Sequence, residues 1–158
     1  MTLDQELALW IGGKVAIVGV GDDGRADDGV GPLVARLLAD TGFQTVIDSG
    51  SSPELDTWRL RDLMPDSVLF LDAVDFGGSP GEVSLLSPND LRSSGFDTHR
   101  APLKLTMQYL ENDLGCRCLL LAVQPKDVRR GAGMCGEVKR SAAILAEALM
   151  NAMPAHMA

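Results

Sequence analysis

Apolar runs separated by polar and glycine-rich stretches divide the chain into short elements. Four such runs predict strands, and the longer three contain continuous apolar stretches, as is typical of strands covered on both faces; the run over 67–74 is apolar until Asp72. These strands are expected over 14–20, 43–48 and 67–74, and over a last run that begins at 117 and ends just before Gln124. Apolar residues at helical spacing predict helices over 30–40, 51–62, 102–113 and about 136–150.

Residues with known capping preferences mark the ends of two of these helices. Near the helix that follows the first strand, Asp28 is a candidate N-terminal cap, Pro32 falls in the first turn, and Gly42 comes just after the end. The next helix opens with Ser51 and Glu54 at the spacing of a capping box.

The order of the elements predicts the topology. Residues 75–87 contain a Gly-Pro-Gly turn and leave no room for a crossover helix, so we expect 82–86 to form a strand antiparallel to its neighbour. The segment 88–100 is expected to be a polar loop with one helical turn. Strands and helices otherwise alternate. The fold class is therefore α/β: a single domain over 1–158, a three-layer α/β/α sandwich whose mostly parallel sheet has about five strands, one of them antiparallel.

Composition narrows the choice of partner and compartment. The net charge is −8 with only 14 Lys and Arg residues, which argues against nucleic acid and anionic membranes and favours a cationic partner or metal. The first ten residues lack a basic region, and no window approaches the roughly 20 apolar residues of a membrane span. With three cysteines in no disulfide pattern, we expect a reduced, soluble, cytoplasmic protein without membrane insertion.

A glycine loop follows the first strand. Gly19, Gly21 and Gly24 match the G-x-G-x-x-G spacing of dinucleotide-binding loops. In those folds the third glycine opens the helix that binds the pyrophosphate, whereas here the helical period begins only at Val30 and four carboxylates intervene. Asp48 does stand where a ribose-binding acid would lie, so a dinucleotide-binding module stays open as an alternative.

Other hydrolase signatures are weak. The Asp-x-Gly triplets at 40–42 and 48–50 look like aspartic-protease motifs, but that chemistry needs two carboxylates from two lobes, so we interpret them as a helix end and a strand-end turn. There is no G-x-S-x-G and no H-E-x-x-H motif. Because His156 lies near the chain end, His99 is the only credible catalytic or ligand imidazole.

Carboxylates instead gather after the predicted strands. In an open parallel sheet the loops at the carboxyl edge form the ligand crevice. We interpret Asp27 and Asp48 as caps, and Asp72, at the end of an apolar strand and half-buried, as a functional residue that needs a cationic, N–H or metal partner. The full set is Asp27, Asp28, Asp48, Asp72 and Asp75.

Five blocks, in their order along the chain, resemble those of the nickel–iron hydrogenase maturation endopeptidases. The likeness extends from about residue 14 to 150 and is greatest to the branch that serves hydrogenases of the formate-hydrogenlyase type, hydrogenase 3. The blocks read VGVGDDGRADDGVGPLVARLL, DSGSSPELD, LFLDAVDFGGSPGEV, DTHRAPLKL and LLLAVQP.

The resemblance implies an endopeptidase that removes the C-terminal extension of a nickel–iron hydrogenase large-subunit precursor after nickel insertion. By motif position, Asp28, Asp72 and His99 would be both the catalytic residues and the metal ligands, in an aspartic-type site. Two oxygens and one imidazole suit nickel, and so few ligands imply that nickel arrives with the substrate, the nickel-loaded precursor.

Two points stay open on the sequence. The family usually has Asn where this chain has Asp22, and an ionised carboxylate cannot donate the hydrogen bonds of an amide, which bears on the geometry of the loop. Nickel could polarise the scissile carbonyl or only dock the substrate. The principal alternative function is a nickel-dependent assembly checkpoint that binds the precursor without cleaving it.

Overall fold

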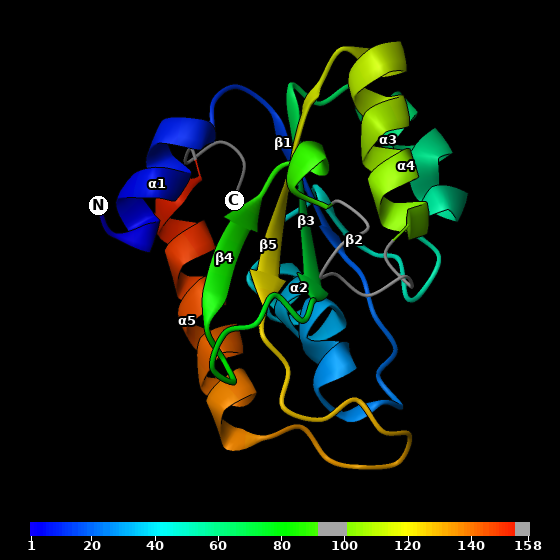
Figure 1. The fold of residues 1–158 in the computed structure, drawn as a ribbon. Coiled ribbons are helices and arrows are strands. Elements are labelled where there is room, and N and C mark those ends of the chain that lie inside the picture. Colours follow the sequence, from blue (N-terminus) through cyan, green and yellow to red (C-terminus); the bar gives the residue numbers. More distant parts are fainter. Residues whose placement is uncertain (92–100, 154–158) are drawn as a thin grey trace.

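The computed structural model describes residues 1–91 and 101–153, which form a twisted five-stranded sheet between helices (Figure 1). The strand order is β2-β1-β3-β5-β4, in which β4 alone is antiparallel. The predicted α/β class, the strand count and the single antiparallel strand are thus confirmed. The strands are β1 Val15–Gly19, β2 Val46–Asp48, β3 Ser67–Ala73, β4 Val83–Leu86 and β5 Arg117–Val123.

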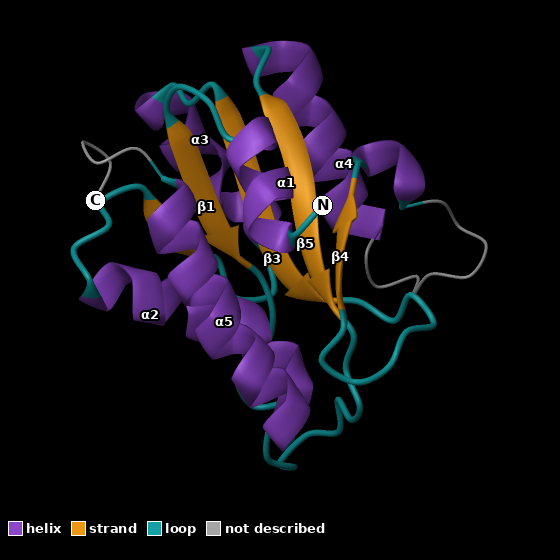
Figure 2. Ribbon diagram, turned by 90° about the vertical axis from the view of Figure 1, so that its left-hand side faces the viewer, coloured by secondary structure: helices purple, strands orange, loops and turns teal. Residues whose placement is uncertain are grey.

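Helices cover both faces of the sheet. Figure 2 shows α1, α2 and α5 together on one face, while α3 and α4 lie on the other. Their bounds are α1 Leu3–Trp10, α2 Val30–Asp40, α3 Thr57–Leu63, α4 Ala101–Tyr109 and α5 Gly136–Ala152. Short 3₁₀ helices occur at η1 Ala26–Gly29, η2 Pro53–Asp56 and η3 Pro88–Asp90, and a π-helical turn, Leu110–Leu114, follows α4. Within the described ranges, no helix is long and apolar enough to cross a bilayer.

The sheet separates two apolar cores, and this explains the continuous apolar runs. All seven residues of β3 are buried, with alternate side chains on opposite faces. Leu69 and Leu71 pack with the core under α2 and α5, whereas Val68 and Phe70 pack with the core under α3 and α4. A strand covered on both sides needs apolar residues at every position, not at alternate ones.

The neighbour of the antiparallel strand is not the one that the short 75–87 connection predicted. We expected β4 beside β3, but β4 pairs with β5, and the connection crosses the end of β5. Two strand spacings are about 10 Å, which a link of this length spans easily. The crossing is held by Gln124, whose Oε1 accepts hydrogen bonds from the N–H groups of Phe76 and Gly78, at 2.9 and 3.0 Å.

The predictions at the starts of two helices need correction. The helix α1 was not predicted, although the side chains of Thr2 and Gln5 form a capping box at its start. The capping box predicted for Ser51 and Glu54 is wrong, because the segment begins as η2 at Pro53 and shows no side-chain cap. The strand expected over 43–48 is shorter, since only Val46–Asp48 of this range pair with β1.

Candidate active site at the carboxyl edge of the sheet

The acid loop, residues 20–29, joins β1 to α2 and packs closely on the end of β3. A Cβ at Gly31 would overlap the carbonyl oxygens of Leu71 and Val20, and a Cβ at Gly21, where φ is +144°, would overlap the carbonyl of Asp28. The glycines therefore let the backbone approach the sheet closely. The helix α2 begins at Val30, as its period predicted, after the intervening η1.

Asp28 lies within η1 and does not cap α2 as predicted. The N-terminal cap of α2 is Gly29, without a side-chain bond. The Asp28 carboxylate instead accepts a hydrogen bond from the backbone N–H of Asp22 at 2.9 Å. Its side chain is partly exposed at the edge of the sheet, where a ligand can reach it.

The side chain of Asp22 stabilises the acid loop by accepting a hydrogen bond. Its Oδ1 accepts the N–H of Gly24 at 2.8 Å, and its Oδ2 lies 3.4 Å from the guanidinium of Arg130. An Asn could accept the first bond equally well, but it could not form the ion pair. The donor to Asp28 is the backbone of Asp22, so an ionised side chain at this position is compatible with the observed geometry.

Asp72 is the penultimate residue of β3 and is completely buried, which goes beyond the half-buried position expected. It lies one residue after Leu71, whose carbonyl accepts the N–H of Val20 at 2.8 Å. Because η1 packs against β3, the structure brings the segments that carry Asp28 and Asp72 together at the carboxyl edge.

The predicted histidine lies outside the described residues. His99 falls in 92–100, and His156 falls in 154–158. Among the residues that the structure does describe, no three His, Cys, Asp or Glu side chains form a group able to hold a metal. The set of Asp28, Asp72 and His99 therefore stays a prediction.

Asp27 is completely buried and holds a distant segment, the 124–135 loop that follows β5 (Figure 1). Its carboxylate accepts the backbone N–H groups of Lys126, Asp127 and Cys135 at 2.8, 3.0 and 2.8 Å, and lies 3.3 Å from the Cys135 thiol. Burial alone would raise the pKa of Asp27, but these N–H donors outweigh it and hold the pKa below its ordinary value. Asp27 is structural, as interpreted, but it caps this loop and not the next helix.

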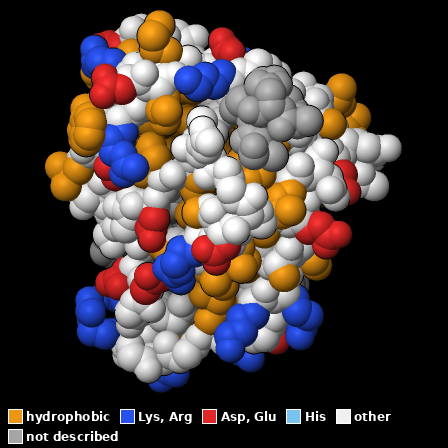
Figure 3. All heavy atoms as spheres, turned by 180° about the vertical axis from the view of Figure 1, so that it is seen from behind, with side chains coloured by type: hydrophobic (Ala, Val, Ile, Leu, Met, Phe, Trp, Pro, Cys, Tyr) orange, Lys and Arg blue, Asp and Glu red, His pale blue; other side chains and the backbone are white. Residues whose placement is uncertain are grey.

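Further bonds join the acid loop to the 124–135 loop. The N–H of Gly131 donates to the carbonyl of Gly24 at 2.9 Å, and Arg25 Nε donates to Val128 O at 3.3 Å. Seen from behind, Lys and Arg side chains lie along the lower end of the molecule (Figure 3), the end that these loops form in Figure 1. Hydrogen bonds thus join the two loops into one rim beside Asp28.

The remaining strand-end acids have local partners. Asp48, interpreted as a cap, is exposed and accepts the N–H of Gly50 at 3.1 Å in a strand-end turn. Asp75 accepts the side-chain amide of Gln124 and the N–H of Gly77, each at 3.0 Å, and these bonds lower its pKa. Both carboxylates are engaged in shaping turns.

Sequence reasoning missed the role of the 124–135 loop. Asp27 and its partners are about a hundred residues apart, and no spacing rule connects them. The available signal was topological, because a segment that leaves β5 emerges at the same carboxyl edge as the acid loop.

Comparisons with known proteins identify the family. A family model described as hydrogenase maturation protease (HycI) matches residues 32–152. The hydrogenase 3 maturation protease of Escherichia coli strain K12 is 38% identical over 109 residues, which are 67% of this chain and 69% of that protein.

Solved structures agree in fold. A nickel–iron hydrogenase maturation protease, HycI, from Thermococcus kodakarensis superposes with a TM-score of 0.86 at 28% identity, covering 94% of this chain and 97% of that one. The solution structure of the endopeptidase HycI from Escherichia coli gives 0.76 at 32% identity, covering 85% and 87%. The chain belongs to the hydrogenase maturation protease family, a family of peptidases that process hydrogenase precursors.

Proposed function

We propose that this peptidase removes the C-terminal extension of a nickel–iron hydrogenase large-subunit precursor and recognises, through Asp28, Asp72 and His99, the nickel already inserted there. One observation supports this most: a completely buried carboxylate, Asp72, lies at the penultimate position of the central strand, where η1 packs against it with Asp28. Ionisable side chains brought together in buried or partly buried positions at the carboxyl edge of a sheet are typical of functional sites.

The chemistry of these side chains suits nickel that is carried by the substrate. Two carboxylate oxygens and one imidazole are ligands for a borderline divalent ion and leave positions open for groups of the precursor. Three ligands that include neither a thiolate nor a second histidine make a weak site for a resident metal, so the ion stays with the precursor when the enzyme dissociates. The net charge of −8 adds general attraction for a cation.

The protein contributes positioning and proton transfer. The N–H of Asp22 orients the carboxylate of Asp28, and the surrounding strand fixes Asp72. A carboxylate beside the scissile bond serves as the base that takes a proton from water. Nickel supplies a docking charge and, next to the scissile carbonyl, a Lewis acid.

The test is cleavage of a nickel-loaded precursor, followed by gel mobility and mass spectrometry. We expect His99→Ala and Asp72→Asn to abolish cleavage while circular dichroism shows a wild-type fold, and Asp48→Asn, an exposed acid at the same edge, to cleave normally. Wild-type rates in folded His99→Ala and Asp72→Asn variants would refute the assignment. Binding without cleavage by the wild-type protein would instead support the checkpoint function.

A further inference from the structure

Among residues 1–91 and 101–153, no strand pairs with the outer edge of β2, the side away from β1. The N–H of Ile17 donates to Thr45 O, and the N–H of Ser49 also donates to β1, so residues 45, 47 and 49 direct their backbone groups inward. In a strand that pairs in parallel, the backbone N–H and C=O groups of successive residues point to opposite edges. The groups of Val46 and Asp48 therefore point outward. In the part of the chain that the structure describes, nothing hydrogen-bonds to these outward groups, and the sheet ends at β2.

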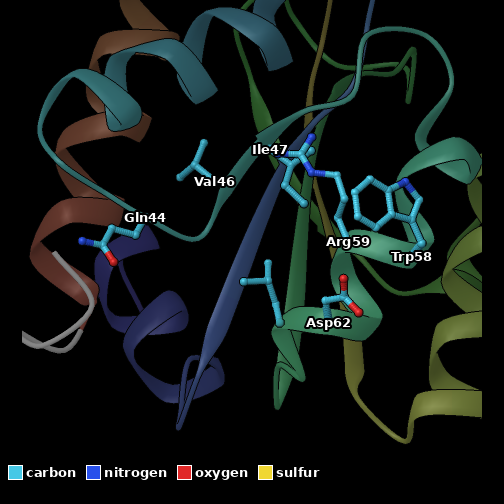
Figure 4. Close-up of a pocket in the computed structure, with 7 residues that line it drawn as sticks. Gln44, Val46, Ile47, Trp58, Arg59 and Asp62 are labelled. Carbon is cyan, nitrogen blue, oxygen red and sulfur yellow. The ribbon is translucent and has the colours of Figure 1, made fainter.

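A hollow of about 260 Å³ lies directly beside this edge, between β2 and α3. Figure 4 shows Trp58, Arg59 and Asp62 projecting from α3, with Ile47 of β2 beside Arg59 and Val46 farther from them. Pockets for small ligands are generally about 300–1,000 Å³, so this one is better matched to one or two side chains. Apolar side chains line it together with Arg59 and Asp62, which carry charges of both signs, a mixture that protein interfaces share.

Apolar side chains on α3 and at its two ends are exposed. Trp58 of α3, which lines the hollow, is 62% exposed, while Leu55 of η2 and Met64, directly after α3, are 70% and 80% exposed. From behind, hydrophobic side chains gather over α3 at the upper left (Figure 3). An exposed tryptophan beside a pocket is the residue type that most often dominates the energy of a protein interface.

We propose that an extended segment of the precursor adds to the open edge of β2 as an extra strand and inserts a side chain into the hollow beside Trp58. This inference rests on the peptidase function and extends it to a docking site that is separate from the reacting groups. Outward N–H and C=O groups at alternate residues are matched by another extended backbone. A family that acts on polypeptides supplies such a segment as its substrate.

The open edge is continuous with the candidate active site. The carbonyl of Gly50, two residues after β2, accepts the N–H of Gly21 at the start of the acid loop at 2.8 Å. An added strand would lie three strand spacings from β3, about 14 Å, which an extended chain covers in roughly four residues. The docked segment and the scissile bond are therefore close neighbours in the precursor sequence.

The first test compares Trp58→Ala with Ile144→Ala, a control on α5 that is also 62% exposed. We expect Trp58→Ala to lower kcat/KM for nickel-loaded precursor at least about tenfold, mainly through KM, because the interaction is remote from the chemistry. The Ile144→Ala variant should match wild type. Equal kcat/KM values for the two variants would overturn the proposal.

A second test measures binding without catalysis. In a Trp10→Phe, Asp72→Asn background, Trp58 is the remaining tryptophan, and a synthetic peptide spanning the extension and the ten residues before it should shift its emission to the blue. Val46→Pro removes an outward donor at the first residue of β2, where proline is tolerated, and should weaken binding at least about fivefold. If the Val46→Pro variant does not fold, the kcat/KM of Trp58→Ala tests the proposal instead.

These measurements separate failure of the docking site from failure of the proposed function. Two results together would support docking and refute the proposed chemistry. They are a shift of Trp58 emission when the peptide binds and normal cleavage by the Asp72→Asn enzyme. Normal cleavage with no dependence on Trp58 would refute docking alone. A dimer by light scattering that Trp58→Ala dissociates, with peptide binding unchanged, would assign the edge to a second copy of this chain and overturn the proposal.

Discussion

Replacing Asp27 by Asn tests whether one buried carboxylate fixes the rim of the site. The carboxylate accepts three backbone N–H groups from the 124–135 loop, and hydrogen bonds to a charged group contribute about 1.5–3 kcal/mol each. In the variant, the amide oxygen of the new side chain can accept two of these hydrogen bonds. Its NH₂ group, however, faces the remaining backbone N–H donor, and the negative charge is lost. We therefore expect a loss of about 3 kcal/mol, or a Tm lower by about 6–12 °C.

The same variant should expose the thiol of Cys135. Burial raises the pKa of Cys135, and the neighbouring Asp27 raises it further. Removing that charge lowers the thiol pKa and loosens the loop, so alkylation by iodoacetamide at pH 8 should accelerate at least several-fold. Cys116 and Cys118, buried with pKa values raised mainly by burial, should stay unmodified in both proteins.

The effect on stability should also depend on pH. Asp27 has a folded-state pKa below its unfolded value of about 3.9, so its stabilisation is present above that pH and is lost as pH falls through the folded value. The difference in Tm between wild type and Asp27→Asn should shrink below about pH 4. An Asp27→Asn variant with wild-type Tm and unchanged Cys135 alkylation at pH 8 would refute the role assigned to this carboxylate.

Two further substitutions test the loop and the core. Asp22→Asn keeps the acceptor for Gly24 and loses only a partly exposed ion pair with Arg130, so Tm should change by less than about 3 °C and the processing rate should stay within twofold; a large loss of either would contradict the acceptor role. Phe70→Ala empties a fully buried position of β3 and should destabilise by about 3–5 kcal/mol in urea unfolding, whereas a loss under 1 kcal/mol would contradict the packing described.

The strands could be predicted because burial on both faces leaves a continuous apolar pattern. For β3 and β5, each covered by helices on both sides, the pattern and the observed strands nearly coincide. The strand order could not be predicted, because the position of β5 between β3 and β4 depends on pairings between segments that are far apart in the sequence. The missed helix α1 had a local signal, the capping box of Thr2 and Gln5.

The site was predictable to the extent that strand ends define it. Apolar runs that end in acids indicated the carboxyl edge, and Asp72 lies there, buried. The bond from Asp22 N–H to Asp28 and the anchoring of a remote loop by Asp27 depend on backbone geometry, which residue types alone do not specify. The cap predicted for Asp28 was wrong because Asp28 lies inside η1, and Gly29 is the N-terminal cap of α2.

The most direct test of nickel recognition compares nickel-loaded and nickel-free precursor under identical conditions. The enzyme is first treated with chelator and desalted, and cleavage of the C-terminal extension is then followed by intact-mass spectrometry. If nickel on the substrate is what Asp28, Asp72 and His99 bind, only the nickel-loaded precursor is cut. Efficient cleavage of nickel-free precursor, or metal retained by the enzyme after chelation, would contradict the account.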